Sequence, residues 1–171
     1  MLNRINPINR TAAQAFLDAL APGERFTFQI FNDKRGGGAR TLHGTLSGVI
    51  PQLDKAQRKG GGVFVTVQPT DGTGRKTENI TAIRAVFVDL DYCKDAGVFD
   101  LAPIAPHIVV SSGRGLHGYW LLQPGQDLEQ FKATQKQLIQ FFSEHGADPA
   151  VHDLARVMRL PGSTHQKGDP L

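Results

Sequence analysis

The chain has 171 residues, 40% of them hydrophobic and 20% charged, with a formal net charge of +3 and a pI of about 9.2. This composition is typical of one soluble globular domain, and the mild basic bias is only a weak indication of a nucleic-acid or phosphate ligand. No apolar run approaches the length of a membrane helix, no signal peptide is recognisable, and the single cysteine, Cys93, excludes an internal disulfide. We therefore expect a cytoplasmic protein in a reducing compartment, with no membrane partner.

The spacing of apolar residues predicts alternating helices and strands. Helices are expected over residues 11–20, 51–59 and 128–144, followed by a short helical stretch that contains Ala155, Val157 and Met158. Strands are expected over residues 26–31, 42–50, 63–67, 83–90, 107–111 and 118–122. Polar, glycine-containing loops are expected over residues 32–40 and 68–77. This order predicts a single α+β domain over residues 1–171, with a mixed, largely antiparallel sheet and helices on its faces.

The first chemical signal is a pair of carboxylates at the end of an apolar run, Ala-Val-Phe-Val, that begins at residue 85. Strand alternation places Asp89 and Asp91 on the same face, where two unpaired carboxylates would repel each other and raise one pKa. A bound divalent cation would remove this repulsion and would explain the pair. The alternative is an ordinary strand end that runs into a polar turn.

The second signal is a Ser-Ser-Gly-Arg-Gly segment between two apolar strands. Glycines let backbone N–H groups approach a phosphate closely, and the side chains of Ser111, Ser112 and Arg114 can add hydrogen-bond donors. His117 follows at the start of the returning strand, which favours a phosphate site over an isolated structural histidine. The alternative is a tight hairpin turn that happens to contain polar residues.

The third signal is a compact charged stretch from Asp148 to Lys167. Arg156 and Arg159 are three residues apart, so on a helix they would share a face and could grip a triphosphate. The alternative is a solvated charged helix in which Asp148 is only the N-cap before Pro149.

Taken in order, these three blocks resemble the archaeo-eukaryotic primase superfamily. Its pattern is Asp-x-Asp on a strand, then Ser-x-His, then an aspartate preceded by a hydrophobic residue, which here is Ala147 followed by Asp148. The sequence is most similar to the RepB-type replication primases of plasmids and phages, which carry a Ser-Ser-x-Gly-x-x-His-x-Tyr-Trp block and an Arg-x-x-Arg-Leu-Pro-Gly block. The resemblance covers roughly residues 26–167. The gap between serine and histidine is longer here than in the shortest family form, so which serine matters is open.

The resemblance implies an RRM-like sheet that carries the active site, next to a small N-terminal α/β unit with flanking helices. It also implies a DNA primase and polymerase: a 3′-hydroxyl attacks the α-phosphate of an incoming nucleotide, and a single-stranded DNA template selects the base. Two Mg²⁺ or Mn²⁺ ions would be held by Asp89, Asp91 and a third aspartate. The residues expected to hold the nucleoside triphosphate are Ser111, Ser112, Arg114, His117, Arg156, Arg159 and Lys167.

Two aspartates compete for the third metal position. The family places a hydrophobic residue before this aspartate and two arginines eight and eleven residues after it. Asp148 fits that spacing to Arg156 and Arg159, whereas Asp153 does not, and an i,i+3 ion pair with Arg156 already accounts for Asp153. Asp148 is therefore the predicted ligand.

Partners are less constrained by the sequence. The basic loops are candidate contacts for the template, and Arg75 and Lys76 are the residues that we expect to bind it. A helicase in cis or in trans would be a further partner of such a primase. The preference for ribo- or deoxynucleotides, and whether the native polypeptide continues beyond Leu171, are left open.

Two other classes of protein share part of this pattern. A phosphatase of the haloacid-dehalogenase type also uses an apolar strand that ends in Asp-x-Asp, but Cys93 stands where that motif has threonine or valine. The interval from Asp91 to Ser111 is also short for the helices which that fold requires. A non-catalytic module that binds single-stranded nucleic acid would not need the Asp-x-Asp pair, and a tyrosine-nicking initiator would need a His-x-His motif, which the sequence lacks.

Overall fold

A computed structural model describes residues 6–32 and 38–165 of the chain. Its helices are α1 (Arg10–Leu20), α2 (Leu46–Arg58) and α3 (Leu128–Phe141), with short 3₁₀ helices η1 (Thr77–Asn79), η2 (Ala96–Leu101) and η3 (Ser143–His145). Its strands are β1 (Phe26–Asn32), β2 (Arg40–Gly44), β3 (Gly61–Thr66), β4 (Ala85–Asp91), β5 (Ile108–Ser111), β6 (Gly115–Leu121) and β7 (Val157–Arg159). No helix in these described ranges is both long and apolar enough to cross a membrane.

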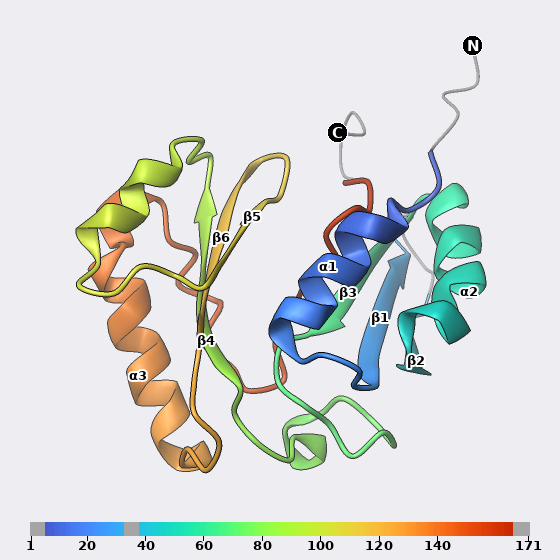
Figure 1. Cartoon of the computed structure of the whole chain (residues 1–171), viewed down its shortest axis with the longest axis horizontal. Coiled ribbons are helices and arrows are strands. Elements are labelled where there is room, and N and C mark those ends of the chain that lie inside the picture. The colour runs from blue at the N-terminus through green and yellow to red at the C-terminus, as the bar shows by residue number, and fades with distance from the viewer. Residues whose placement is uncertain (1–5, 33–37, 166–171) are drawn as a thin grey trace.

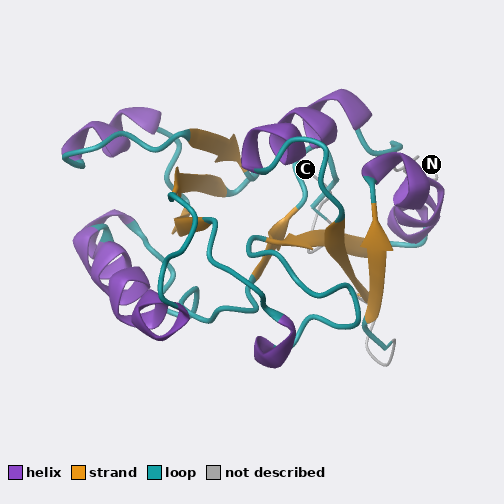
Figure 2. Ribbon diagram, turned by 60° about the horizontal axis from the view of Figure 1, so that its bottom comes forward, coloured by secondary structure: helices purple, strands orange, loops and turns teal. Residues whose placement is uncertain are grey.

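The strands are divided between two antiparallel sheets, which lie side by side in Figure 1. The first sheet has the order β2-β1-β3-β7, and the second has the order β4-β6-β5. Figure 2 shows the strands as two central groups with the helices around them. The α+β class expected from the sequence is therefore confirmed, with the strands in two sheets.

Helix α2 packs on the first sheet, mainly against β3, and α3 packs on β4 of the second sheet. Helix α1 links the two units: its Arg10 pairs with Asp54 of α2 over 3.5 Å, and its Phe16 lies edge-on against Tyr119 of β6, with ring centroids 5.3 Å apart. The buried Gln135 of α3 accepts a hydrogen bond from the N–H of Phe87 and donates to the carbonyl oxygens of Phe87 and Val151. This side chain thereby fixes α3 and the C-terminal segment to β4.

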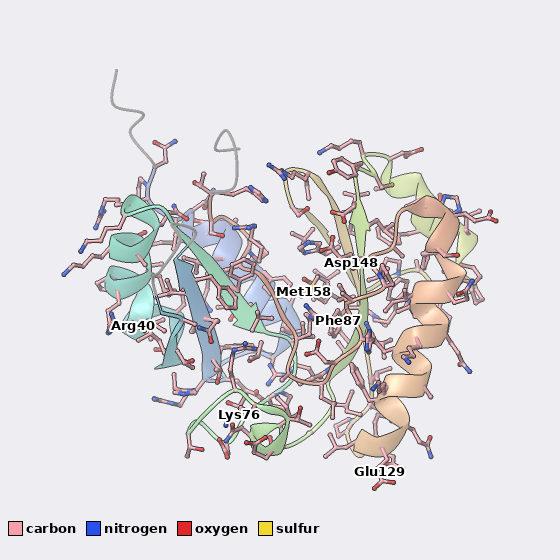
Figure 3. The ribbon with its side chains drawn as sticks, turned by 180° about the vertical axis from the view of Figure 1, so that it is seen from behind. Arg40, Lys76, Phe87, Glu129, Asp148 and Met158 are labelled. Atoms are coloured by element: carbon pink, nitrogen blue, oxygen red, sulfur yellow. The ribbon has the colours of Figure 1, made fainter. Side chains whose placement is uncertain are left out.

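The C-terminal segment joins the two sheets. Ala147 forms an isolated antiparallel bridge with Leu90 of β4, and ten residues later β7 pairs with β3 of the first sheet. In Figure 3, Asp148 and Met158 lie in the middle of the molecule, whereas Arg40 lies at the far side of the first sheet. The end of β4 and the start of the Ser-Ser-Gly hairpin therefore face β7.

Most predicted elements are present, but two assignments were wrong. The segment 42–50 is not one strand: β2 ends at Gly44 and α2 begins at Leu46, because Leu46, Val49, Ile50 and Leu53 follow helical spacing and are buried together. Pro51 therefore lies inside α2.

The predicted helical stretch around Val157 and Met158 is instead the strand β7, in which Met158 pairs with Val65 and is buried. The partner strand is nearly one hundred residues away in the sequence. Local periodicity over three residues carries no information about such a partner. Strand β6 also begins at Gly115, three residues earlier than predicted.

Candidate active site

Asp89 and Asp91 lie at the C-terminal end of strand β4, as predicted. Asp89 is paired with His117 of β6, and Asp91 is paired with Gly115. The Asp89 side chain is 26% exposed, whereas Asp91 lies at the open end of the strand. The two carboxylates share one face of the second sheet because they are two residues apart on a regular strand.

Asp148 lies on the opposite side of β4 from His117. Its backbone N–H donates to the carbonyl oxygen of Asp89 over 2.8 Å, and the N–H of Asp91 donates to the carbonyl oxygen of Gly146, also over 2.8 Å. These bonds flank the antiparallel bridge between Leu90 and Ala147, so Asp148 is opposite Asp89 and shares its face. The segment 146–148 is thus a short additional strand along the edge of β4.

The expected helix after Asp148 does not form. Residues 149–150 form a turn, and Asp148 Oδ1 accepts a hydrogen bond from the N–H of Ala150 over 2.8 Å. Asp148 therefore caps a turn rather than a helix.

Two glycines permit the close approach of chains on both sides of β4. A Cβ atom at Gly115 would lie 1.9 Å from the carbonyl oxygen of Leu90. Gly146 has a φ of 84°, and a Cβ there would lie 2.6 Å from the carbonyl oxygen of Asp91. The end of β4 can be flanked by β6 and by residues 146–148 only because these positions carry no side chain.

The electrostatics of Asp89 reflect this crowding of carboxylates. Burial raises the pKa of Asp89, and the negative charges of Asp91 and Asp148 raise it further, to about 7. Arg159 and Arg156 oppose the shift without cancelling it. The two arginines therefore do not offset the burial of Asp89 and the repulsion from its neighbouring carboxylates.

His117 is buried beside Asp89. Its Nε2 lies 3.4 Å from Asp89 Oδ1, and its Nδ1 lies 3.3 Å from the hydroxyl of the buried Tyr119. Burial and the positive charge of Arg159 lower the pKa of His117 to about 4, so the contact with Asp89 is not an ion pair at neutral pH. If Tyr119 donates to Nδ1, the single ring proton is on Nε2, and the imidazole presents an N–H donor towards Asp89 and the adjoining cavity.

A cavity of about 260 Å³ opens over this face and is called the catalytic cavity below. It is lined by Phe64, Asp89, Asp91, Tyr92, Ser112, Arg114, His117, Val157, Met158, Arg159 and His165. A cavity of about 240 Å³ adjoins it, shares Ser112, His117 and Arg159, and also contains Ser111. Five predicted nucleotide-binding residues are thereby brought together: Ser111, Ser112, Arg114, His117 and Arg159.

The Ser-Ser-Gly segment is a tight hairpin, the simpler of the two interpretations of that sequence. Ser112 N–H donates to the carbonyl oxygen of Gly115 over 3.0 Å, and Ser112 Oγ accepts from Gly115 N–H over 3.1 Å. The Lys94 side chain donates to the carbonyl oxygen of Gly113. The hairpin still places Ser112 and Arg114 at the wall of the catalytic cavity.

Arg156 is separated from this group. It forms an ion pair of 2.6 Å with Asp153, the i,i+3 pairing expected from the sequence, and it lines a different cavity. The shared helical face expected for Arg156 and Arg159 was wrong, because Arg159 belongs to the strand β7. Lys167 lies outside the described residues.

The two residues predicted to contact the template, Arg75 and Lys76, have different surroundings. Arg75 Nε donates to Gln29 over 2.7 Å and its Nη1 donates to the carbonyl oxygen of Ala155 over 3.0 Å, so this arginine has a structural anchor. Lys76 is exposed, and its ammonium lies 3.8 Å from the carboxylate of Glu78.

Several lining residues were not predicted. His165 lies in the third charged block and Phe64 on a predicted strand, but neither was predicted as a site residue. Tyr92 directly follows Asp91, is 79% exposed and has a φ of 62°, a conformation that favours glycine or asparagine. Its position after the Asp-x-Asp pair was the one signal available for it.

The donor set fits divalent cations in its chemistry. Three carboxylates lie near one end of β4, and burial together with repulsion from Asp91 and Asp148 raises the pKa of Asp89. Carboxylate oxygens are the preferred ligands of Mg²⁺ and Mn²⁺. In the described ranges no group of three acidic, histidine or cysteine side chains is preassembled around one point, so metal binding would require a change in side-chain torsions.

Solved structures with the same fold are primases. The AEP domain of the cyanophage S-2L primase-polymerase aligns with a TM-score of 0.75 and 22% identity, covering 95% of this chain and 86% of that one. The catalytic domain of primase RepB′, solved in complex with initiator DNA, aligns with a TM-score of 0.67 and 21% identity, covering 92% and 78%. The chain therefore has the fold of the archaeo-eukaryotic primase-polymerases.

The sequence comparisons define the family. The model of the RepB DNA-primase N-terminal domain matches residues 68–170, which include all three aspartates and His117. The chain belongs to this family, as the order of its three blocks indicated. A replication protein of Clostridium perfringens is 32% identical in an alignment that covers 61% of this chain and 29% of the relative. The chain thus matches less than a third of the length of that relative.

Proposed function

We propose that this chain is the catalytic domain of a replication primase that synthesises DNA primers on single-stranded DNA and extends them as a polymerase. The observation that carries the proposal is the pairing of Asp148 opposite Asp89 at the end of β4, where Asp89 and Asp91 line a cavity together with the neutral, buried His117 and the cationic Arg159. A site with carboxylates on one side and phosphate-binding donors on the other suits a metal–triphosphate complex.

Asp89, Asp91 and Asp148 are the residues that would hold two Mg²⁺ or Mn²⁺ ions. Bound there, the ions would stabilise the attacking and leaving oxygens of nucleotidyl transfer. The aspartates set the position of the reacting centre, since Asp89 and Asp148 are fixed to each other by a backbone hydrogen bond.

The donors on the opposite wall would orient the triphosphate. The Nε2–H of a neutral His117 would donate to a phosphate oxygen without changing the charge of the site. Arg159 and Arg114 would supply charge-assisted hydrogen bonds, and Ser112, which sits in both adjoining cavities, a hydroxyl donor. Lys167, just beyond the described residues, is proposed for the same group.

The partners follow from this reaction. They are a single-stranded DNA template and nucleoside triphosphates, with a helicase acting in cis or in trans at the replication origin of a plasmid or phage. The fold of primase RepB′, whose catalytic domain was solved with initiator DNA, supports a DNA partner here.

One assay tests the proposal. The protein is incubated with single-stranded DNA, labelled nucleotides and Mg²⁺ or Mn²⁺, with and without an annealed primer. Template-dependent incorporation under both conditions is expected, and it should disappear when the divalent cation is chelated. Release of phosphate from simple esters without incorporation would instead indicate a phosphatase, and DNA binding without either reaction would indicate a binding module.

A further inference from the structure

A third cavity also adjoins the catalytic cavity and contains none of the three aspartates. Its volume is about 460 Å³, within the range of roughly 300–1,000 Å³ that is usual for small-ligand sites. It is lined by Phe31, Phe64, Arg75, Asp153, Ala155, Arg156 and Val157. Phe64 and Val157 also line the catalytic cavity, so the two cavities share one wall. This site is called the template cavity below.

Four planar side chains form a continuous row from one cavity to the other. The guanidinium of Arg75 lies 5.9 Å from the ring centroid of Phe31, and the rings of Phe31 and Phe64 are 5.2 Å apart in an edge-on arrangement. The guanidinium of Arg159 lies 4.7 Å from the ring centroid of Phe64. The row begins in the template cavity and ends beside His117, in the catalytic cavity.

The two phenylalanines are not part of the apolar core. They lie on the face of the first sheet opposite to the buried Ile30, Val63 and Val65, and both are only partly buried. Arg75 is held against Phe31 by its hydrogen bonds to Gln29 and to the carbonyl oxygen of Ala155. The row is therefore kept in place by the fold without contributing to the core.

The wall of the template cavity also contains an unsatisfied hydrogen-bond donor, in the side chain of Arg156. The Nε of Arg156 is buried, and no hydrogen-bond partner for it is found in the described part of the chain. Its Nη2 is paired with Asp153 and donates to the carbonyl oxygen of Ala150, but neither contact involves Nε. A buried unsatisfied donor is rare in proteins, and it is explained if a ligand supplies the acceptor.

We infer that the template cavity binds the unpaired nucleobase of the single-stranded DNA template, next to the incoming nucleotide. Aromatic rings and guanidinium planes are the groups on which single-stranded bases stack, and the Nε–H of Arg156 would donate a hydrogen bond to a base or phosphate oxygen. The shared wall of Phe64 and Val157 would put the bound base beside the nucleotide whose phosphates Arg159 contacts. This inference rests on the proposed function, because it assigns a template to the same reaction.

The test measures binding without synthesis. Single-stranded oligonucleotides that contain one 2-aminopurine are titrated with wild type and with Phe31→Leu, and both anisotropy and 2-aminopurine fluorescence are recorded. Phe31 is chosen because it lines only the template cavity. Loss of one base–aromatic stack should weaken DNA affinity about tenfold and reduce the fluorescence quenching, whereas Phe31→Tyr should retain both.

The control is Phe141→Leu, which removes an exposed phenylalanine ring from α3, in the other unit. It should bind DNA as wild type does. Binding of a non-hydrolysable nucleotide with Mg²⁺, in the absence of template, should be unchanged in Phe31→Leu. If Phe31→Leu is folded by circular dichroism and binds DNA normally, or if it loses nucleotide affinity instead, the inference is overturned. If Phe31→Leu does not fold, the test uses the aromatic variants. Unchanged quenching of 2-aminopurine fluorescence by Phe31→Tyr and stronger quenching by Phe31→Trp then support the inference. The absence of quenching by wild type overturns it.

These outcomes are separate from failure of the proposed function. A wild-type protein that never incorporates nucleotides would contradict the primase reaction, whatever Phe31→Leu does. A wild-type protein that synthesises primers while Phe31→Leu binds template normally would contradict only the template cavity.

Discussion

The backbone N–H of Asp148 donates a hydrogen bond to the carbonyl oxygen of Asp89 over 2.8 Å, although the two residues are 59 positions apart in the sequence. This bond places Asp148 directly opposite Asp89 on the edge of β4, with both side chains on the face that bears the cavity. A helix N-cap would not require such a bond. The relationship therefore favours a shared task for the two carboxylates.

The first prediction concerns Gly146, which allows this pairing. Gly146→Ala should destabilise the fold by more than the ~1–2 kcal/mol expected for a left-handed non-glycine residue, because the new Cβ would meet the carbonyl oxygen of Asp91. Gly125→Ala is the matched control: its φ of 89° is similar, but a Cβ there meets nothing within 4 Å. Thermal unfolding of both variants gives the comparison, and equal losses would contradict the packing argument.

The second prediction uses the raised pKa of Asp89. Because its pKa of about 7 in the folded protein is above the unfolded value of 3.8, the folded state binds the proton more tightly. Protonation of Asp89 therefore contributes fully to the free energy of unfolding below pH 3.8, and this contribution is lost as the pH rises through 7. At 1.36 kcal/mol per pKa unit, the loss is at most about 4 kcal/mol. Metal-free wild type should thus become less stable relative to Asp89→Asn between pH 5 and pH 8.

His117 has the opposite pH dependence, since its lowered pKa makes stability fall as pH drops below 6.5. This contribution is largely common to wild type and Asp89→Asn, which is why the difference between them is measured by denaturant titration. Added Mg²⁺ should restore wild-type stability most strongly at high pH, because bound metal requires the deprotonated carboxylate. A constant difference across this pH range would contradict the account.

The third prediction assigns His117 to the nucleotide. His117→Ala should raise the KM for the incoming nucleotide, lower kcat, or both, by about 10- to 100-fold, because a donor to the triphosphate is lost. Template affinity should change little. Steady-state kinetics at saturating template, together with DNA titrations, separates these effects, and a variant that loses template affinity at an unchanged nucleotide KM would move His117 out of this role.

The fourth prediction separates two adjacent basic residues. Lys76 is exposed, so Lys76→Ala should reduce the slope of log K against log salt for template binding by about 1 and leave stability unchanged. Arg75→Ala removes hydrogen bonds to Gln29 and Ala155, so it should lower the free energy of unfolding by about 1–3 kcal/mol. Salt titrations and chemical denaturation check the pair; a salt slope of zero in wild type would remove electrostatics as the main source of template affinity.

Local patterns in the sequence predicted the structural features that are set within a single strand or helix. The apolar run that ends in Asp89 and Asp91 predicted β4 and its shared carboxylate face, and α3 was found within three residues of its expected end. The position of Asp148 beside Asp89 was expected from the family pattern, with only partial support from the residues themselves. Its hydrogen bond to β4 is visible only in the structure.

Features that depend on partners far along the chain were not predictable in this way. The three residues of β7 have a sequence pattern that a helical turn could also have, and only their pairing with β3 defines them as a strand. The separation of Arg156 from Arg159 follows directly from that error, because strand geometry turns their side chains to different cavities. Phe64 was read as an ordinary strand residue, since nothing local shows that it faces Arg159.

The most direct test of the account is nucleotide incorporation by Asp148→Asn and Asp153→Asn, measured on primed single-stranded DNA over a range of Mg²⁺ concentrations. Both substitutions remove one negative charge and nearly conserve shape, and thermal unfolding confirms that each variant is folded at the assay temperature. We predict that Asp148→Asn loses incorporation at every Mg²⁺ concentration, as Asp89→Asn and Asp91→Asn do, whereas Asp153→Asn, which loses its ion pair with Arg156 in the template cavity, remains active at saturating template. An active Asp148→Asn together with an inactive Asp153→Asn would contradict the proposed metal centre.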